Sequence, residues 1–414
     1  MSSFPMPPIY VNDQPCHEPT SSKYVKSIEP VMKASLPERT PLFSHEPNGP
    51  AYRIPSLIYI KEENTFVAFA ERRKNNADVS AEYVVMRRGI YKTGYVKWEG
   101  IQPLHEATMK NHRTMNPCSV YDKNSKVLFL FFNCIPDGVT ENHMRVWGNS
   151  SKLCYVTSSD FGKTWSFIKD ITEVTNGIRK MTTCFLSPGH GIQTQDGKLI
   201  IPAYVYIAKY WCIHWWFDAA QSFYLYSADQ GHKWEISQRI VKYKSGECEL
   251  AEICDDGKNM LYCNARSTSV KRVEALSLNI GGEFKFVEKS RKLKEIKDGC
   301  HGSVLSFLGG EETAQNHNHW LMFSHPIKND RRDLGIFLNT FPLKSDSWSK
   351  PWVIYEGFSG YSDLVDCQEA NTFAVLFEGG DKTHYEHIYF CLFTLEDVLE
   401  NIKKKKSLFA RFKK

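Results

Sequence analysis

Several arginines in this sequence stand in short, distinctive motifs, and their side chains are the clearest candidates for binding a ligand. Examples are Arg53 in Tyr52–Pro55 (YRIP) and Arg266 in Asn264–Arg266 (NAR). A guanidinium keeps its positive charge and holds a carboxylate with two parallel hydrogen bonds, so a group of arginines suits an acidic ligand. A single arginine more often forms a surface salt bridge, and the wider sequence has to decide between the two.

Carboxylates and a tyrosine also lie in polar motifs. Glu247 and Glu249 belong to Gly246–Glu249, and Tyr361 lies in Gly360–Leu364 (GYSDL). Residues two apart on a strand share one face, so periodicity does not separate Glu247 from Glu249. A phenol has a pKa of about 10 and is a poor nucleophile unless a base lies beside it. Taken alone, Tyr361 would be interpreted as a buried aromatic residue.

The twelve cysteines indicate neither a metal site nor a disulfide framework. The sequence has no C-x-x-C pair and no spaced set of four Cys and His residues, which argues against zinc. The first eleven residues lack the apolar core of a signal peptide, so we expect a reducing compartment and free thiols. The sequon Asn149–Ser151 is then accidental. No stretch approaches the roughly 20 apolar residues that span a bilayer.

The charge balance argues against a nucleic-acid-binding protein. The formal net charge is +5, and the last dozen residues alone carry more than that. The rest of the chain is therefore close to neutral and lacks the excess of basic residues that a phosphate backbone requires.

The chain is organised around a repeated turn that must position these side chains. The pattern S-x-[DN]-x-G-x-x-[WF] occurs at Ser158–Trp165, Ser227–Trp234 and, in a weaker form, Ser277–Phe284. The Asp or Asn closes a tight turn, the glycine adopts a positive φ, and the aromatic ring packs between sheets. The second copy follows the first by 69 residues and the third follows the second by 50. Such spacing fits one four-stranded propeller blade plus a variable loop.

Short β-prone runs continue through most of the chain, and helical periodicity is nearly absent before Leu395–Lys405. This pattern indicates a β-sandwich, barrel or propeller, and the repeat favours the propeller. We therefore predict an all-β fold, a six-bladed β-propeller over residues 42–400 with about 60 residues per blade. Residues 1–41 hold eight prolines and predict a flexible extension, in which Met32 is an alternative start. Residues 401–414 form a basic tail.

Motifs across residues 42–400 resemble those of the sialidases (neuraminidases), above all the vertebrate cytosolic and membrane-associated members. Tyr52–Pro55, upstream of several S-x-D-x-G-x-x-W turns, carries the resemblance. Together with Pro188–Gln193 (PGHGIQ) and Gly360–Ser362 (GYS), it is most similar to the plasma-membrane-associated ganglioside sialidases. The family implies a six-bladed propeller and an exo-α-sialidase, a glycoside hydrolase that releases terminal sialic acid with retention of configuration. Further matching stretches are Arg87–Gly89, His112–Pro117, Ile201–Tyr204, Asn264–Arg266 and Asp333–Gly335.

The resemblance implies three arginines that bind the carboxylate of sialic acid. By motif these are Arg53, Arg266 and Arg332; Arg331 is adjacent to Arg332, so the third assignment is open by one residue. Glu378 matches the family glutamate that orients the first arginine. No metal or organic cofactor is implied, because the arginines bind the anion.

The resemblance also implies Tyr361 as the nucleophile and Glu247 as its base, with Glu249 as the nearby alternative. A carboxylate nucleophile would be repelled by the carboxylate on the anomeric carbon, whereas a neutral phenol is not; sialidases are the glycosidases with a tyrosine nucleophile. Asp78 matches the acid that protonates the leaving group. The substrate-contacting residues implied by the family are Arg73, Glu141, Tyr204 and Tyr206.

Three functions compete for this propeller: an exo-α-sialidase, a sialic-acid-binding lectin without hydrolysis, and a scaffold for protein interactions. A lectin needs the arginines but no nucleophile, base or acid, and a scaffold needs none of them. The joint presence of Tyr361, Glu247 and Asp78 favours the enzyme.

We predict that the protein acts on sialylated glycolipids (gangliosides), with oligosaccharides and glycoproteins as further substrates. The predicted location is peripheral, at the plasma or an endosomal membrane, or else cytoplasmic. The aromatic stretch Tyr210–Phe217 suits a membrane interface, and the tail Lys403–Lys414 suits anionic lipid, which attracts basic residues by roughly 1 kcal/mol per charge. The alternative places these aromatic residues in a blade core and leaves the tail in solvent.

Overall fold

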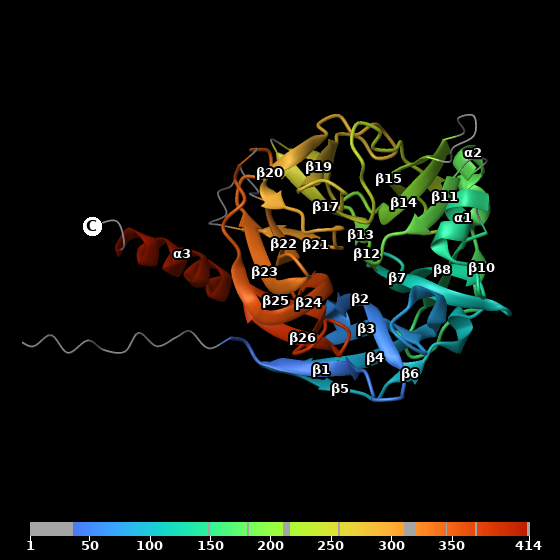
Figure 1. Cartoon of the computed structure of the whole chain (residues 1–414), viewed down its shortest axis with the longest axis horizontal. Coiled ribbons are helices and arrows are strands. Elements are labelled where there is room, and N and C mark those ends of the chain that lie inside the picture. The colour runs from blue at the N-terminus through green and yellow to red at the C-terminus, as the bar shows by residue number, and fades with distance from the viewer. Residues whose placement is uncertain are drawn as a thin grey trace, which may run out of the picture. The chain divides into compact units, whose positions relative to one another are not determined.

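The computed structural model describes residues 36–147, 150–179, 182–209, 216–255, 257–309, 319–344, 346–368 and 371–411. Within these ranges the strands form the predicted six-bladed propeller, with the blades arranged in a ring about a central axis (Figure 1). Residues 1–35, most of the predicted extension, lie outside the described residues.

The elements follow one another almost entirely as strands. The strands are β1 Arg39–Ser44, β2 Ala51–Ile60, β3 Thr65–Arg73, β4 Ala81–Lys92, β5 Tyr95–Trp98, β6 Gln102–Pro103, β7 His112–Asp122, β8 Val127–Pro136, β9 Lys152–Ser158, β10 Lys169–Asp170, β11 Thr182–Leu186, β12 Gly189–His190, β13 Ile192–Gln193, β14 Leu199–Lys209, β15 Trp216–Ser227, β16 Glu235–Ile236, β17 Cys248–Asp255, β18 Lys258–Ala265, β19 Lys271–Ser277, β20 Glu288–Lys294, β21 Ser303–Leu308, β22 His319–Lys328, β23 Arg332–Asn339, β24 Trp352–Asp366, β25 Thr372–Gly380 and β26 His387–Thr394. The α-helices are α1 Glu141–Trp147, α2 Asn176–Arg179 and α3 Leu395–Arg411, and 3-10 turns cover Lys61–Glu63, Asp78–Ser80, His105–Ala107 and Thr172–Thr175.

The strand order shows how the ring closes. Four blades are built by β2–β6, by β7–β10 with β12, by β11 with β13–β16, and by β17–β20. One seven-stranded sheet, β21-β22-β23-β24-β25-β26-β1, supplies the last two. The long strand β24 ends one of these blades and begins the next. Strand β1 pairs antiparallel with β26, so the beginning of the propeller completes its final blade. This closure satisfies the outer edge of that blade with the chain's own backbone.

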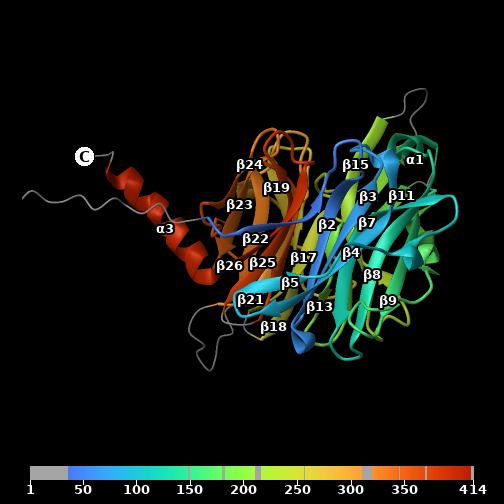
Figure 2. The ribbon, with the colours of Figure 1, turned by 90° about the horizontal axis from the view of Figure 1, so that it is seen from below.

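Two predicted boundaries shift in the structure. Strand β1 begins at Arg39, slightly before the predicted boundary at residue 41. Helix α3 continues to Arg411, beyond the predicted helical stretch Leu395–Lys405, so the first part of the predicted tail is helical. Figure 2 shows α3 leaving the last blade beside β26.

The repeated turns have the geometry that their residues predict. The hydroxyl of Ser158 accepts a hydrogen bond from the Gly162 N–H at 2.8 Å, and the Asp160 carboxylate accepts one from the Thr164 N–H at 2.8 Å. Gly162 has a φ of 82°, which only glycine adopts without strain. The second copy repeats these bonds, and its Trp234 is buried against Phe129 and Phe131 of the neighbouring blade.

A fourth copy of the turn escaped the sequence pattern. Asn339 forms a bridge with Trp348, just as Ser277 does with Phe284 in the third copy, and Trp348 is buried. The two bridging residues are nine positions apart here instead of seven, and the turn has no glycine. The buried aromatic residue therefore has the same position as in the other turns, although the residues of the turn differ.

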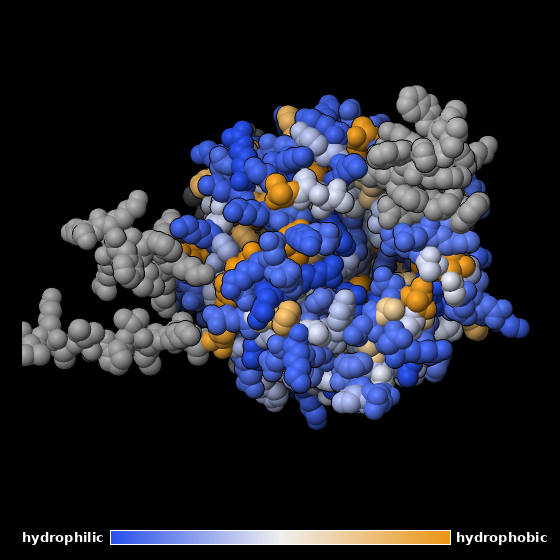
Figure 3. Space-filling model, viewed as in Figure 1, coloured by the Kyte–Doolittle hydropathy of each residue, from blue (hydrophilic) through white to orange (hydrophobic). Residues whose placement is uncertain are grey.

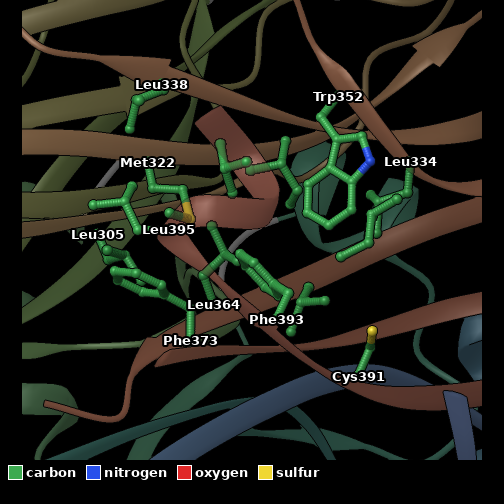
Figure 4. Close-up of a cluster of buried hydrophobic side chains, with 14 of the residues drawn as sticks. Leu305, Met322, Leu334, Leu338, Trp352, Leu364, Phe373, Cys391, Phe393 and Leu395 are labelled. Carbon is green, nitrogen blue, oxygen red and sulfur yellow. The ribbon is translucent and has the colours of Figure 1, made fainter. Parts of the chain in front are cut away.

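Large apolar side chains fill the space between neighbouring strands and blades. Figure 4 shows the cluster at the seven-stranded sheet, where Trp352, Phe373 and Phe393 pack with aliphatic residues of the same blades. Leu395 and Val398 at the start of α3 are buried in this cluster and anchor the helix. The face shown in Figure 3 is mostly hydrophilic, with hydrophobic residues in small separate groups.

Candidate active site

β-Bulges interrupt the inner strands at one end of the propeller and turn the site residues toward the axis. In β2 the register shifts between Arg53 and Ser56, and Ile54 has a φ of 61°. In β7 the register shifts between Met115 and Cys118, and Asn116 has a φ of 56°. A proline follows each of these positive-φ residues. Proline has no backbone N–H, and none is needed here because the hydrogen bonds between the strands are interrupted at the bulge. The bulges explain the distinctive residue types of YRIP and of the stretch that ends in Asn116-Pro117.

The bulges border a cleft of about 770 Å³. Nine of the predicted site residues line it: Arg53, Arg73, Asp78, Glu141, Tyr204, Tyr206, Glu247, Arg266 and Tyr361. Glu378 is buried directly behind Arg53, and Arg332 does not reach the cleft. Residues from widely separated blades thus meet in one place, as a ring of blades allows.

Tyr361 and Glu247 form the closest pair in the cleft. The Tyr361 hydroxyl donates to Glu247 Oε1 at 2.5 Å, and Arg266 Nη1 donates both to Glu247 Oε2 at 2.8 Å and to the Tyr361 oxygen at 2.9 Å. Burial raises the pKa of Tyr361 well above its usual value, and the charge of Glu247 adds to this effect. Burial alone would raise the pKa of Glu247, but Arg266 and His301 lower it below its usual value. The pair is therefore a protonated phenol beside an ionised carboxylate.

Glu249, the alternative to Glu247, faces a different environment. Its carboxylate accepts from the Val304 N–H at 2.8 Å and lies 3.6 Å from the His190 ring. His190 Nδ1 also contacts Asp363 Oδ1 at 2.6 Å, so a histidine joins two buried carboxylates on the propeller axis. Burial alone would lower the pKa of His190, but Glu249 and Asp363 raise it to about 9. Glu247 precedes β17 and enters the cleft, whereas Glu249 lies within the strand and belongs to the axis cluster.

Arg53 is held by a buried carboxylate. Its Nε and Nη2 donate to the two oxygens of Glu378 at 2.9 and 3.2 Å. Glu378 also accepts from the Ile54 and Tyr361 N–H groups at 2.9 and 3.1 Å. Burial alone would raise the pKa of Glu378, but Arg53 lowers it to about 2. One carboxylate thus fixes both the arginine and the backbone of the tyrosine.

Of the two adjacent candidates for the third arginine, Arg331 lines the cleft and the predicted Arg332 does not. The Arg331 guanidinium lies 5.4 Å from the centre of the Tyr361 ring, and its Nη2 donates to the Gly299 carbonyl at 3.3 Å. Arg332 is exposed and its guanidinium lies over the Phe358 ring at 4.2 Å. Arg331 lies in the turn before β23 with a φ of 54°, whereas Arg332 is the first residue of the strand. The two side chains therefore point in different directions.

Asp78 lies on an exposed loop and contacts Arg73. Arg73 Nη1 donates to Asp78 Oδ1 at 2.6 Å, and its other nitrogens donate to Glu71, which is fully buried. Glu71 also accepts from the Asn116 N–H at 2.7 Å, so it ties two blades together behind the cleft. Burial alone would raise the pKa of Asp78, but Arg73 and Arg53 lower it.

The remaining predicted residues also line the cleft. Tyr204 and Tyr206 are two residues apart on β14 and share one face, and their rings lie 5.6 Å apart in an edge-to-face contact. Glu141 begins α1 and faces the cleft beside them. Phe185 stacks on Tyr204 at 5.4 Å and adds an apolar surface.

Sequence reasoning missed several residues of the site. Glu71 lies two residues before the predicted Arg73 on β3, and this spacing on one strand face is a usable signal. Arg113 and Asn116 line the cleft and belong to the quoted stretch His112–Pro117. His384 and Tyr385 also line it, and the Arg53 guanidinium lies 4.7 Å from the Tyr385 ring. No motif marks these two residues.

The predicted membrane contacts fall largely outside the described residues. Residues 210–215, most of the stretch Tyr210–Phe217, are not described, and the side chains of the tail beyond Lys403 are not described either. Among the described helices, none combines the length and the apolar character needed to cross a bilayer.

Comparisons with known proteins agree with this architecture. Residues 64–374 match the model of the BNR repeat-like domain. The chain is 40% identical over 390 residues to Sialidase-3 of Mus musculus, covering 86% of this chain and 93% of that protein. It is 39% identical over 402 residues to Sialidase-3 of Homo sapiens, covering 88% and 94% of the two chains.

Solved structures support the fold. A Hadza microbial sialidase superposes with a TM-score of 0.68 at 19% identity, covering 84% of this chain and 66% of that one. The intramolecular trans-sialidase from Ruminococcus gnavus gives a TM-score of 0.64 at 15% identity, covering 86% and 97%. Taken with the curated relatives, these findings show that the chain belongs to the vertebrate sialidase family and is an exo-α-sialidase, a glycoside hydrolase similar to sialidase-3 over most of its length.

Proposed function

We propose that the protein cleaves terminal sialic acid from gangliosides by a retaining mechanism in which Tyr361 is the nucleophile and Glu247 its base. Arg53, Arg266 and Arg331 bind the substrate carboxylate, with Arg331 in place of the predicted Arg332. Asp78 is the acid and base at the leaving group. Arg73, Glu141, Tyr204 and Tyr206 contact the rest of the sugar, and Glu378 orients Arg53.

The observation that carries this proposal is the 2.5 Å hydrogen bond between Tyr361 and Glu247 inside a cleft lined by arginines. A phenol needs an adjacent base to become a nucleophile, and this base already accepts a hydrogen bond from the phenol hydroxyl. The base is ionised because Arg266 compensates its charge. A lectin would have no use for a buried tyrosine and carboxylate in this contact.

The reaction proceeds in two balanced steps. Tyr361 Oη bonds to the anomeric carbon while the glycosidic C–O bond breaks; Glu247 takes the phenol proton and Asp78 gives a proton to the leaving oxygen. A water then attacks the anomeric carbon, Asp78 takes a proton from it, the bond to Tyr361 breaks, and Glu247 returns its proton to the phenol. Two inversions at one carbon give overall retention.

Asp78 must be protonated before the first step, although Arg73 and Arg53 lower its pKa in the free cleft. A bound sialic acid changes this balance, because its carboxylate compensates the charge of Arg53 and the sugar excludes water from the exposed Asp78 loop. Both effects raise the pKa of the Asp78 carboxyl group and so favour its protonated form. The loop position of Asp78 allows it to adjust when the substrate arrives.

Purified full-length protein tests the mechanism directly. We expect it to hydrolyse a fluorogenic α-sialoside, and NMR of the fresh product should show the α-anomer of sialic acid first. Immediate appearance of the β-anomer would show inversion and contradict a tyrosyl intermediate. Binding of the sialoside without hydrolysis would favour the lectin.

The ganglioside preference is supported by the resemblance to the membrane-associated sialidases and by the basic sequence of α3. This helix is anchored by Leu395 and Val398 and continues through four consecutive lysines, Lys403–Lys406, to Arg411. Clustered lysines are attracted to anionic lipid by roughly 1 kcal/mol each near the surface. Such a helix would hold the propeller at a bilayer that displays the substrate.

A tail truncation after Ile402 tests this part, because it keeps the packed turns of α3. We expect it to lower hydrolysis of ganglioside in anionic vesicles, and vesicle binding in low salt, while hydrolysis of a soluble sialyl-oligosaccharide stays unchanged. Replacing Lys403–Lys406 with glutamine is the matched control that keeps the helix length and should act alike. Equal loss on both substrates, or preference of the intact protein for the soluble one, would contradict the assignment.

A further inference from the structure

The segment Ile296–His301, which joins β20 to β21 and is called the support loop below, touches several residues of the cleft without being one of the motifs. The Asp298 carbonyl accepts from Arg266 Nη2 at 2.7 Å, and the Gly299 carbonyl accepts from Arg331 Nη2 at 3.3 Å. The His301 ring stacks on the Tyr361 ring with 5.3 Å between centroids and 26° between planes. One short loop therefore meets two arginines and the tyrosine.

The support loop is fixed from below by a buried ion pair. Arg272 in β19 is fully buried, and its Nη1 donates to Glu295 Oε2 at 3.0 Å and to the Cys300 carbonyl at 2.6 Å. Glu295 Oε1 accepts from the Ile296 and Cys300 N–H groups at 3.1 and 3.2 Å. The ion pair thus forms hydrogen bonds with the backbone near both ends of the support loop, at Ile296 and Cys300.

Further contacts lock this anchor in place. His325 lies 3.0 Å from Glu295 Oε1, and Arg272 Nε donates to Asn264 at 2.7 Å, two residues before Arg266. Burial alone would raise the pKa of Glu295, but Arg272 and His325 lower it to about 2. The contacts therefore favour the ionised form of Glu295, which accepts the hydrogen bonds of the loop.

We propose that the support loop is a positioning element that sets the orientation of Arg266, Arg331 and the Tyr361 ring for the substrate, and that the Arg272–Glu295 pair holds it in register. The inference rests on the proposed function, because it assigns the loop a role in binding sialic acid. None of its residues takes part in the chemistry.

The arginines are oriented by backbone carbonyls of the support loop, and the chemistry of these contacts explains why a loop suits this role. A carboxylate that orients an arginine also compensates its charge, as Glu378 does for Arg53. A backbone carbonyl restrains a guanidinium while leaving its full charge for the substrate carboxylate. Arg331 is restrained by the Gly299 carbonyl, and Arg266 by the Asp298 carbonyl in addition to its bond with Glu247. Precise orientation of such groups decides how well they bind, and a displacement of about 1 Å can cost roughly 100-fold in rate.

Gly299 offers a sharp test. It has a φ of 70°, and a Cβ there would lie 2.8 Å from Arg266 Nε and 2.9 Å from the Ser267 carbonyl. Gly299→Ala should therefore displace Arg266 and weaken inhibition by a planar sialic-acid analogue roughly tenfold, with KM rising more than kcat falls. Gly257→Ala is the matched control, because Gly257 has a φ of 71° with no neighbouring atom within 4 Å.

A double-mutant cycle separates positioning from general damage. If the loop acts through Arg266, the effects of Gly299→Ala and Arg266→Lys on the inhibition constant should be clearly less than additive. If the melting temperature of Gly299→Ala is far below that of Gly257→Ala, Glu295→Gln is used in the cycle instead, because it keeps the shape of the Glu295 side chain. Equal inhibition constants for the Gly299 and Gly257 variants, or full additivity, would overturn the inference. Failure of the wild-type protein to bind the analogue would instead refute the proposed function.

Discussion

Tyr361→Phe is expected to lower kcat by roughly 1,000-fold or more, the scale on which enzymes lose activity when a nucleophile is removed. The substitution deletes only the hydroxyl that donates to Glu247 at 2.5 Å and accepts from Arg266 at 2.9 Å. The ring remains stacked on His301, so the shape of the cleft is preserved. Arg266 keeps its bond to the other oxygen of Glu247, which limits the cost of the lost contact.

The measurement is turnover of a fluorogenic sialoside together with the inhibition constant of a planar sialic-acid analogue. We expect the inhibition constant to change only a few-fold, because the three arginines are untouched. Tyr355→Phe is the control: its hydroxyl is also buried and donates to the Gly380 carbonyl at 3.0 Å, but it lies outside the cleft lining. Activity of Tyr361→Phe within tenfold of the control would remove Tyr361 from the mechanism.

The fold could be predicted because its signal is local and repeated. In the turn at Ser158–Trp165, every bond that shapes it joins residues within a few positions of each other, so the pattern of residue types contains the structure. The copy at Asn339–Trp348 shows the limit of this reasoning. There the blade needs the buried aromatic ring, and the intervening turn is free to change in length.

Much of the site could be named from motifs, but its contacts depend on distant blades. Glu378 and Arg53 are 325 residues apart, and Tyr361 and Glu247 are 114 residues apart. Spacing along the chain gives no account of such pairs. The choice between Glu247 and Glu249 likewise required the structure, because the first lies before β17 begins and so the alternation of a regular strand does not apply to it.

The choice between Arg331 and Arg332 was left open by the sequence and leads to the second large expected effect. Arg331→Ala should lower kcat/KM and weaken binding of a planar sialic-acid analogue roughly 100-fold, because hydrogen bonds between charged groups contribute about 1.5–3 kcal/mol. Arg332→Ala should change both by less than about twofold, since its side chain is exposed over Phe358. The two variants form a matched pair with the same chemical change at adjacent positions.

The inhibition constant of the analogue is the decisive measurement, because it reports carboxylate binding without the chemical step. Removing Arg331 takes a positive charge from beside the Tyr361 ring, and the fold loses the hydrogen bond that joins this turn to the support loop. Thermal stability of the two variants should therefore be similar, and Arg331→Lys should fall between wild type and Arg331→Ala, since an ammonium restores the charge but not the two-pronged fork. A larger effect for Arg332→Ala would return the third arginine to the position suggested by sequence. Equal, small effects for both would mean that Arg53 and Arg266 alone hold the substrate carboxylate.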